Sequence, residues 1–215
     1  KSFNAMTGFF NSAIISVGVT ACTVYFSTMT AFAIVAYDWK LRNAFFSMIM
    51  CVLMIPATVT SIGFYKFMYS IGMTNNFAAL ILPSIAAPST VFFMRQFMLS
   101  SLPMEILQSA RIDGAGEFRI FNQIALPMMK PAIAVQAIFA FVANWNNYYT
   151  QNMILKSDKL HTMPIMVAKV LGFDKQKDYG VDYLCITLSI LPIVIIYFIL
   201  SKFIIAGVAL GGVKE

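Results

Sequence analysis

Five long apolar runs limit the folds open to this chain more than any other feature. The middle of each run holds no Asp, Glu, Lys or Arg, and a helix of roughly 20 apolar residues is needed to cross a hydrocarbon core about 30 Å thick. The runs cover residues 12–37, 44–65, 77–99, 128–149 and 181–205. Backbone groups in lipid must be hydrogen-bonded internally, and the runs lack the alternation of barrel strands. We therefore predict one all-α integral membrane domain over residues 1–215, with five transmembrane helices.

The composition favours the same environment. Apolar residues make up 60% of the chain and charged residues 11%, whereas about a quarter of an ordinary globular domain is charged. The solvent is therefore predicted to be a lipid bilayer. The net charge of +6 comes from 15 Lys and Arg residues scattered between the runs, whereas a nucleic-acid surface would gather them on one face. We expect no nucleic-acid partner.

Several kinds of chemistry are missing from the sequence. The three cysteines lie inside apolar runs without metal-ligand spacing, and His161 has no second ligand nearby. There is no Gly-x-x-x-x-Gly-Lys-Ser/Thr phosphate loop. The spans carry no central ionisable residue of the kind that ion-driven transporters use. We expect no catalytic residue, metal or cofactor in this chain, so any solute movement would take its energy from elsewhere.

The gaps between the runs indicate how the chain is threaded. The short basic turn at 38–43 favours the cytoplasmic side. Alternating crossings then place the loop 100–127 inside and the loop 150–180 outside, although Lys and Arg are nearly equal in number on the two sides. Because the chain begins at Lys1 without a methionine, we expect a sixth, N-terminal span to precede it.

Four prolines interrupt the predicted spans. Pro56 lies in the second run, Pro83 and Pro88 in the third, and Pro192 in the fifth. Each proline removes a helical hydrogen bond. Two interpretations stay open, namely broken helices that line a pathway and ordinary packing kinks.

The loop 100–127 is more polar than the runs and has its own pattern. Ser100 and Ser101 are expected to cap a helix whose first turn holds Pro103, and two glycines end that helix at a sharp bend. A second short helix is predicted to end at Pro127 and to carry one apolar stripe, made of Phe118, Phe121 and Ile124. Such a helix–turn–helix suits a knob that docks in a partner's groove, and equally an amphipathic connector on the lipid headgroups.

A spaced motif decides between these interpretations. It reads Gln108-Ser109-Ala110, three residues, Gly114, nine residues, Ile124, one residue, Leu126-Pro127. This run resembles the EAA loop of bacterial ABC importer permeases, whose pattern is Glu-Ala-Ala, three residues, Gly, nine residues, Ile, one residue, Leu-Pro. Gln108 and Ser109 replace the first two residues of that pattern. Gln108 therefore lacks the charge expected to meet a basic residue of an ATPase.

The resemblance extends along nearly the whole chain and points to one branch of the family. Pro103-x-Glu105 and Ile112-Asp113-Gly114-Ala115 resemble the carbohydrate-uptake, maltose-type branch. Further matches are Asn11-Ser12, Pro56, residues 92–96, Trp145-Asn146 and the Gly-rich basic tail 207–214.

The resemblance implies that the loop 100–127 is a cytoplasmic coupling loop, which sits in a cleft of a separate ATPase. Asp113, Gly114 and Ala115 would form its bend, with Glu105, Gln108 and Arg111 as polar docking contacts. The expected coupling residues are Glu105, Gln108, Ser109, Ala110, Arg111, Asp113, Gly114 and Ala115. Bulky or charged substitution at Gly114 is predicted to uncouple transport while the protein stays in the membrane.

The resemblance also implies partners and a function. Two ATPase subunits that bind ATP and Mg would drive a pair of permeases, made of this chain with a homologous partner or a second copy. An extracellular solute-binding protein would deliver the solute. The chain would then be a permease subunit of an ATP-driven importer for sugars or oligosaccharides in the bacterial cell membrane. An importer for an amino acid, peptide or phosphate stays open, as does a non-transport membrane scaffold.

The end of the fourth run is the candidate substrate contact. Asn144, Trp145 and Asn146 combine amides, which bond sugar hydroxyls, with an aromatic face on which a sugar ring can stack. The alternative is an aromatic belt at headgroup level. The partner permease is a second source for a sugar site.

Overall fold

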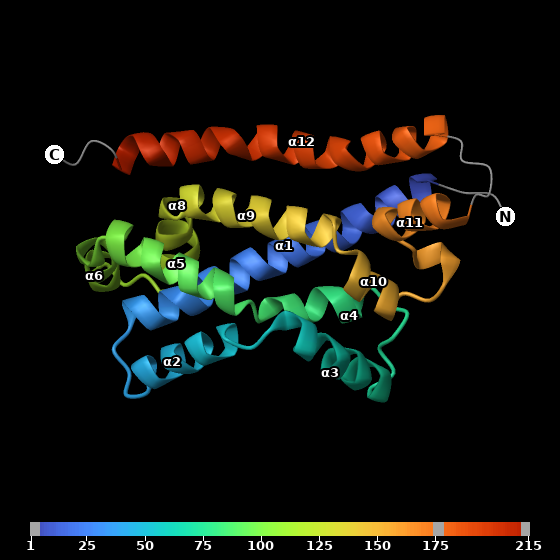
Figure 1. Cartoon of the computed structure of the whole chain (residues 1–215). Coiled ribbons are helices and arrows are strands. Elements are labelled where there is room, and N and C mark those ends of the chain that lie inside the picture. Colours follow the sequence, from blue (N-terminus) through green and yellow to red (C-terminus); the bar gives the residue numbers. More distant parts are fainter. Residues whose placement is uncertain (1–4, 174–178, 212–215) are drawn as a thin grey trace. The chain divides into compact units, whose positions relative to one another are not determined.

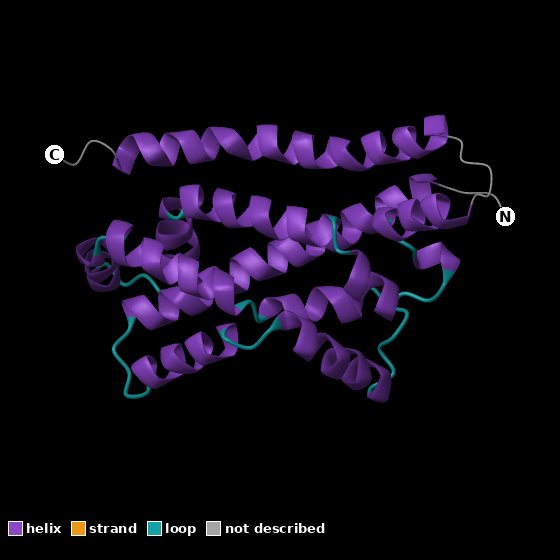
Figure 2. Cartoon of the chain, in the orientation of Figure 1, coloured by secondary structure: helices purple, strands orange, loops and turns teal. Residues whose placement is uncertain are grey.

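The chain folds into helices. The computed structural model describes residues 5–173 and 179–211, and Figure 2 shows helices joined by loops and turns, with no strand in these two ranges. Three stretches are long and apolar enough to cross a membrane, namely Met6–Ala36, Ala78–Ser101 and Tyr183–Phe203. Two helix pairs, each bent at a short break, bring the number to as many as five. The predicted all-α membrane fold is confirmed.

The first and last predicted spans are long single helices. Helix α1 (Ala5–Ala36) has no charged residue, and two of its threonines bond to carbonyls of their own helix. Thr28 Oγ1 donates to the Val24 carbonyl at 2.6 Å and Thr30 Oγ1 to the Phe26 carbonyl at 2.8 Å, which lets polar side chains sit in an apolar helix. Helix α12 (Tyr179–Gly211) holds Pro192 without interruption.

The second and third predicted spans are broken at prolines. Pro56 separates α2 (Arg42–Leu53) from α3 (Ala57–Ser70), so 44–65 is two helices and not one. The third span is divided into α4 (Ala78–Ile81), the 3₁₀ helix η1 (Leu82–Ile85) and α5 (Pro88–Ser101). A proline lacks the amide hydrogen of the helical ladder and forces the preceding residue toward an extended conformation, which explains both breaks.

Short helices follow in the two long loops. The loop 100–127 contains α6 (Met104–Ile112), α7 (Glu117–Ile120), the π-helix η2 (Phe121–Ala125) and α8 (Leu126–Met128). Helix α9 (Lys130–Trp145) ends four residues before the predicted fourth span does. It is followed by α10 (Tyr148–Ile154), the 3₁₀ helix η3 (Asp158–Leu160) and α11 (Met163–Phe173). Residues 174–178 of the loop 150–180, with Lys175 and Lys177, and the end of the tail from 212 lie outside the described residues.

The described chain divides into two compact units. The first lies within 1–21, 57–84 and 138–199, and the second within 22–56, 85–137 and 200–215. Each of the five predicted spans begins in one unit and ends in the other. The turn 38–43 and the loop 100–127 consequently belong to the second unit, while the loop 66–76 and the described part of the loop 150–180 belong to the first.

The second unit has its core between the end of α1, α5 and the loop 100–127. Phe32 and Ala36 of α1 are buried with Met94 and Met98 of α5 and with loop residues that include Leu107, Ile120 and Phe121. Helix α2 contacts α5, and Ile49 of α2 forms a smaller cluster with Val91 of α5 and Ile34 of α1. Figure 1 shows α2 beside the end of α1. The loop 100–127 is therefore part of this unit's core and not a loose connection.

The first unit has a core of its own. It is built from the early part of α1, from α3 and α4, and from α10 with the residue after it. Its buried members are Ile15, Val19, Met68, Ala79, Ile154 and Leu155.

Candidate coupling site

The bend of the loop 100–127, called the coupling loop below after its predicted role, is a complete helix C-cap. Gly114 has a φ of +80°, in the left-handed region that favours glycine. Its amide donates to the Arg111 carbonyl at 3.0 Å, and the Ala115 amide donates to the Ala110 carbonyl at 3.0 Å. These two bonds define a Schellman motif, in which the last carbonyls of a helix are satisfied by the chain that turns away. The predicted bend is confirmed.

The start of the coupling loop differs from the prediction. Ser100 and Ser101 do not cap α6, because both still belong to α5, where Ser100 Oγ donates to the Phe97 carbonyl at 2.9 Å. The N-cap position of α6 is Pro103, with no side-chain capping bond. Leu102, the residue before Pro103, is extended, as a residue before proline tends to be. Helix α5 therefore continues through both serines, and α6 begins only at Met104.

The predicted apolar stripe of the second short helix is also wrong. Phe121 is buried and Ile124 packs against the core, whereas the side chain of Phe118 is 71% exposed. The reason is the π-helix η2, whose wider turn shifts residues from 121 onward out of the α-helical register. Pro127 does not end the helix either, because it lies in the first turn of α8, where its missing amide hydrogen costs nothing.

A charged cluster ties the coupling loop to the end of α1. Arg111 Nε donates to Glu117 Oε1 at 2.7 Å and Arg111 Nη2 to Glu117 Oε2 at 3.2 Å, which makes a two-pronged contact across the bend. Arg111 Nη2 also donates to the Ala36 carbonyl at 3.3 Å. The Tyr37 hydroxyl donates to Glu117 Oε2 at 2.6 Å, and the Arg111 guanidinium carbon lies 5.3 Å from the centre of the Tyr37 ring. We call Arg111, Glu117 and Tyr37 the Arg111 cluster.

Both charges of the Arg111 cluster are stabilised where they stand. The hydrogen bonds from Arg111 and then from Tyr37 lower the pKa of the Glu117 carboxyl. The hydrogen bond to Glu117 likewise raises the pKa of the Arg111 guanidinium. The pair is thus fully ionised at neutral pH, when charge-assisted hydrogen bonds are strongest.

The other expected coupling residues divide into an exposed and a packed group. Ala110 and Ala115 are half-buried and pack on the core of the second unit. The exposed group consists of Glu105, Gln108, Ser109, Asp113 and Gly114. The Ser109 hydroxyl donates to the Glu105 carbonyl at 2.9 Å, within the same helix.

The apolar side chains on the exposed side of this loop were not predicted from the sequence. Ile112 is 86% exposed and Ile106 44% exposed, in addition to Phe118. A signal was present, because Met104, Leu107 and Ala110 recur every three residues and form the packed stripe. Ile106 and Ile112 lie off that stripe and so must face outward.

The candidate substrate residues at the end of α9 are placed differently from one another. Trp145 is buried, its indole nitrogen donates to the Ser189 carbonyl at 2.8 Å, and its ring stacks on Phe141 with centroids 5.6 Å apart. The Asn144 amide donates to the Ala140 carbonyl at 2.8 Å, while Asn146 is exposed. Asn146 is thus the one of the three whose side chain faces outward, and substrate contact by any of them stays a prediction.

A hollow of about 270 Å³ lies beside these residues within the first unit. It is lined by Trp145, Asn146, Tyr148, Pro164, Leu171 and Ser189, among others.

Among the described residues, no three His, Cys, Asp or Glu side chains are grouped so as to hold a metal ion.

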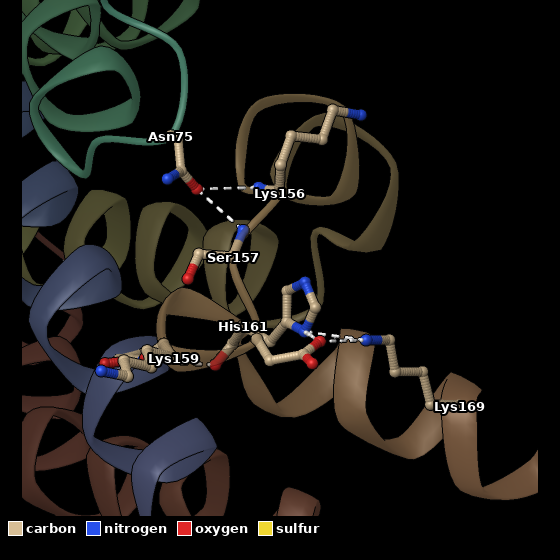
Figure 3. A network of polar contacts seen from close by, with 8 residues as sticks. Asn75, Lys156, Ser157, Lys159, His161 and Lys169 are labelled. Carbon is tan, nitrogen blue, oxygen red and sulfur yellow. Dashed lines mark hydrogen bonds and ion pairs between the residues drawn. The ribbon is translucent and has the colours of Figure 1, made fainter.

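The described part of the loop 150–180 is held by a second polar network (Figure 3). The Asn75 side-chain oxygen accepts the amides of Lys156 at 3.0 Å and Ser157 at 2.9 Å. Further along, Lys169 Nζ donates to Asp158 Oδ1 at 2.8 Å and lies 3.0 Å from His161 Nδ1. Burial lowers the pKa of the His161 imidazole, and the charge of Lys169 lowers it further against the opposing effect of Asp158.

Comparison with known proteins agrees with this geometry. The family model described as "binding-protein-dependent transport system inner membrane component" matches residues 23–210. The chain belongs to this family. As a member, it is a multi-pass transport component of a membrane and not an enzyme. The family description itself makes a binding protein part of the transport system.

Relatives of this inner membrane component include named permeases. The chain is 38% identical over 212 residues to the arabinooligosaccharides transport system permease protein AraQ of Halalkalibacterium halodurans, covering 97% of this chain and 74% of the relative. It is 31% identical over 199 residues to the sn-glycerol-3-phosphate transport system permease protein UgpE of Rhizobium meliloti, covering 92% and 70%.

A solved structure shares the fold of this inner membrane component. It is the crystal structure of a bacterial ABC transporter involved in the import of the acidic polysaccharide alginate. The match has a TM-score of 0.80 at 20% sequence identity and covers 92% of this chain and 74% of that chain. The predicted fold class is therefore confirmed a second time.

Proposed function

We propose that this chain is the permease subunit of an ATP-driven importer for sugars or oligosaccharides, forming half of the translocation pathway and receiving its energy through the coupling loop. The observation that carries the proposal is the compact loop itself. Its bend is closed by backbone hydrogen bonds, and its base is part of the core of the second unit. Its exposed side presents Ile112 beside Gln108 and Gly114.

This surface suits a protein groove. The exposed apolar side chains of this loop, Ile106, Ile112 and Phe118, offer contact area to an apolar groove of a partner. A rigid knob also transmits a displacement, whereas a flexible segment would absorb it. Closure of two ATPase subunits on ATP and Mg would then move the second unit through this loop. Gln108 supplies a neutral contact where the family pattern has a charge.

The same proposal assigns each loop to one side of the membrane. The turn 38–43 and the coupling loop belong to one unit, and the Arg111 cluster joins the loop to Ala36 and Tyr37, directly before that turn. The loop 66–76 touches the loop 150–180 through Asn75 in the other unit. Alternating crossings require this arrangement, so the coupling loop is assigned to the cytoplasm and the loop 150–180 to the outside of the bacterial cell membrane. There, an extracellular solute-binding protein would dock.

Sugar is the solute that the relatives favour. The named substrate of AraQ is an arabinooligosaccharide, and the exposed Asn146 with Tyr148 beside it offers the amide and aromatic groups that bind sugars. A second homologous permease, or a second copy of this chain, would complete the pathway. The relative UgpE, whose named substrate is sn-glycerol-3-phosphate, makes a phosphorylated polyol the second candidate.

The test is reconstitution of the chain with its ATPase, partner permease and solute-binding protein in vesicles. We expect the ATPase to co-purify with the chain, and an arabinooligosaccharide to stimulate ATP hydrolysis in the presence of the binding protein. Stimulation by sn-glycerol-3-phosphate but not by the arabinooligosaccharide would identify a phosphorylated polyol as the substrate class. No co-purified ATPase would contradict the proposed function as a whole and favour a membrane scaffold.

A further inference from the structure

Arg111 was expected to be a docking contact, but its donors face into the chain. Nε and Nη2 are both directed at Glu117, and Nη2 also reaches the Ala36 carbonyl. Its side chain is 31% exposed, whereas Gln108 and Ser109 on the same helix are exposed. Two of the three guanidinium nitrogens are therefore engaged within this chain.

The Arg111 cluster joins three segments at one point. Arg111 comes from α6 and Glu117 from α7, on either side of the Gly114 bend. Tyr37 and the Ala36 carbonyl belong to the end of α1. A bidentate contact between a guanidinium and a carboxylate fixes an angle as well as a distance. The cluster thus fixes the angle of the bend and the position of the bend relative to α1.

Apolar contacts between the loop and α1 hold the loop in place but do not set its angle. Leu107, Ile120 and Phe121 pack against Phe32 of α1 and its neighbours, and Tyr25 donates to the Asn122 side chain at 3.2 Å. Apolar contact is not directional, so the packed side chains do not fix the angle of the Gly114 bend, and the Tyr25 hydrogen bond lies beyond that bend, on η2. Near the Gly114 bend, the directional contacts are those of the Arg111 cluster.

We propose that Arg111, Glu117 and Tyr37 are positioning residues that lock the coupling loop to the end of α1, so that a displacement imposed at Gln108 to Gly114 moves α1 with it. This inference rests on the proposed function. It assigns Arg111 a role within the chain, separate from the exposed residues that would meet the ATPase. Because the pair is partly exposed, it contributes little to the stability of the fold, and variants that lack it are expected to fold and insert.

The test compares two arginines of the same loop in the reconstituted importer. Arg111→Gln removes the cluster, while Arg119→Gln removes an exposed arginine whose Nε donates to Gln123 at 2.8 Å, four residues away. We expect uptake per ATP hydrolysed to fall about fivefold in Arg111→Gln and in Glu117→Gln, and less than about twofold in Arg119→Gln. The double variant Arg111→Glu with Glu117→Arg is expected to recover part of the loss. The amount of co-purified ATPase is expected to stay unchanged.

A distance measurement tests the lock without reference to activity. Spin labels at Lys40→Cys and Ser109→Cys, both exposed positions of the second unit, report the separation of the loop from the end of α1 once the native Cys22, Cys51 and Cys185 are replaced by serine. The lock predicts one narrow distance that is the same with and without an ATP analogue, and a broader distribution once Glu117→Gln is added. A wild-type distance that changes with the analogue would overturn the inference.

The outcomes separate this inference from the proposed function. Unchanged uptake per ATP in both single variants, with a working wild-type complex, overturns only the inference. So does loss of the co-purified ATPase in Arg111→Gln, since Arg111 would then be a docking contact. Absence of uptake in the wild-type complex contradicts the proposed function and the inference with it.

Discussion

The coupling loop and the loop 150–180 are both long polar segments held against α1, but different chemistry holds them. The coupling loop meets the end of α1 through charged groups of the Arg111 cluster. The described part of the loop 150–180 meets the early part of α1 through neutral groups. There, the Asn11 amide donates to the carbonyls of Lys159 and His161, each at 2.9 Å, and the Ser12 hydroxyl accepts the Met163 amide at 2.8 Å.

This difference separates two kinds of loop. Neutral bonds to the backbone fix the path of the loop 150–180, and its exposed side chains include Lys156 and Lys159, which suits a hydrated, polar partner. The charged cluster fixes side-chain angles in the coupling loop, whose end exposes Ile112. The first arrangement presents a surface, whereas the second resists rotation.

The largest effect is expected at the base of the coupling loop. Leu107 is fully buried in the core of the second unit, whereas Ile112 lies on the same helix and is 86% exposed. Leu107→Ala should lower the free energy of unfolding by about 2–5 kcal/mol through lost burial and the cavity left behind. Thermal unfolding of the purified protein in detergent measures this change. Ile112→Ala is the matched control, and an equal loss in both variants would refute the packing described for α6.

A smaller effect is expected at the anchor of the loop 150–180. Asn11→Ala leaves the buried His161 carbonyl and the partly buried Lys159 carbonyl without their donor and should cost about 1–3 kcal/mol. Proteolysis of the described part of the loop, from the side assigned to the outside in sealed vesicles, should become faster. Asn43→Ala, at an exposed asparagine, serves as the control. Equal cleavage of both variants would show that the amide does not hold this loop.

Replacement of Ile112 should change docking and leave the fold intact. Ile112→Ser removes the exposed apolar side chain at the end of α6. Loss of more than about 1 kcal/mol of binding free energy is typical of a central apolar contact, so affinity for the ATPase should fall about five- to tenfold. Binding of the purified ATPase to the detergent-solubilised chain measures it. An unchanged affinity would place the groove contact elsewhere on the loop.

The smallest effect is a pH dependence confined to the loop 150–180. The folded state lowers the pKa of His161 below its usual value near 6.5, so the unfolded state binds more protons between the two values. The contribution of neutral His161 to the stability of the folded loop is therefore complete above pH 6.5, and it is lost as the pH falls toward the lowered pKa. Hydrogen exchange of residues 157–169, corrected for intrinsic rates, should show less protection at pH 5.5 than at 7.5. The difference should vanish in His161→Gln, and its persistence would assign the effect to another group.

The sequence predicted the features of this molecule that depend on local chemistry. Gly114 marks the bend because its left-handed backbone disfavours other residues, and Pro56 marks the break of the second run because it cannot continue a helix. Apolar length predicted the spans. Residues of the coupling loop were found by motif spacing, which is also local.

Features that depend on distant partners were not predictable. The exposure of Phe118 follows from the π-helix η2, which no propensity signals. Arg111 meets Glu117 six residues on, across the bend, and Tyr37 is 80 residues away from Glu117 in the sequence. Trp145 is buried because Phe9 and Ser189 pack on it from other parts of the chain. Such contacts are set by tertiary structure and leave no pattern in a single sequence.

The proposal that energy enters the chain through the coupling loop, and not through the first unit, is best tested by a pair of glycines. Gly114 in the coupling loop and Gly72 in the first unit both have positive φ, at +80° and +69°, and neither would bring a new Cβ within 4 Å of another atom. Aspartate tolerates this backbone region, so Gly114→Asp and Gly72→Asp carry a similar cost to the fold. The measurement is uptake per ATP hydrolysed in the reconstituted importer. We predict that Gly114→Asp abolishes uptake with the protein still in the membrane, while Gly72→Asp retains it; equal uptake in the two variants would contradict the account.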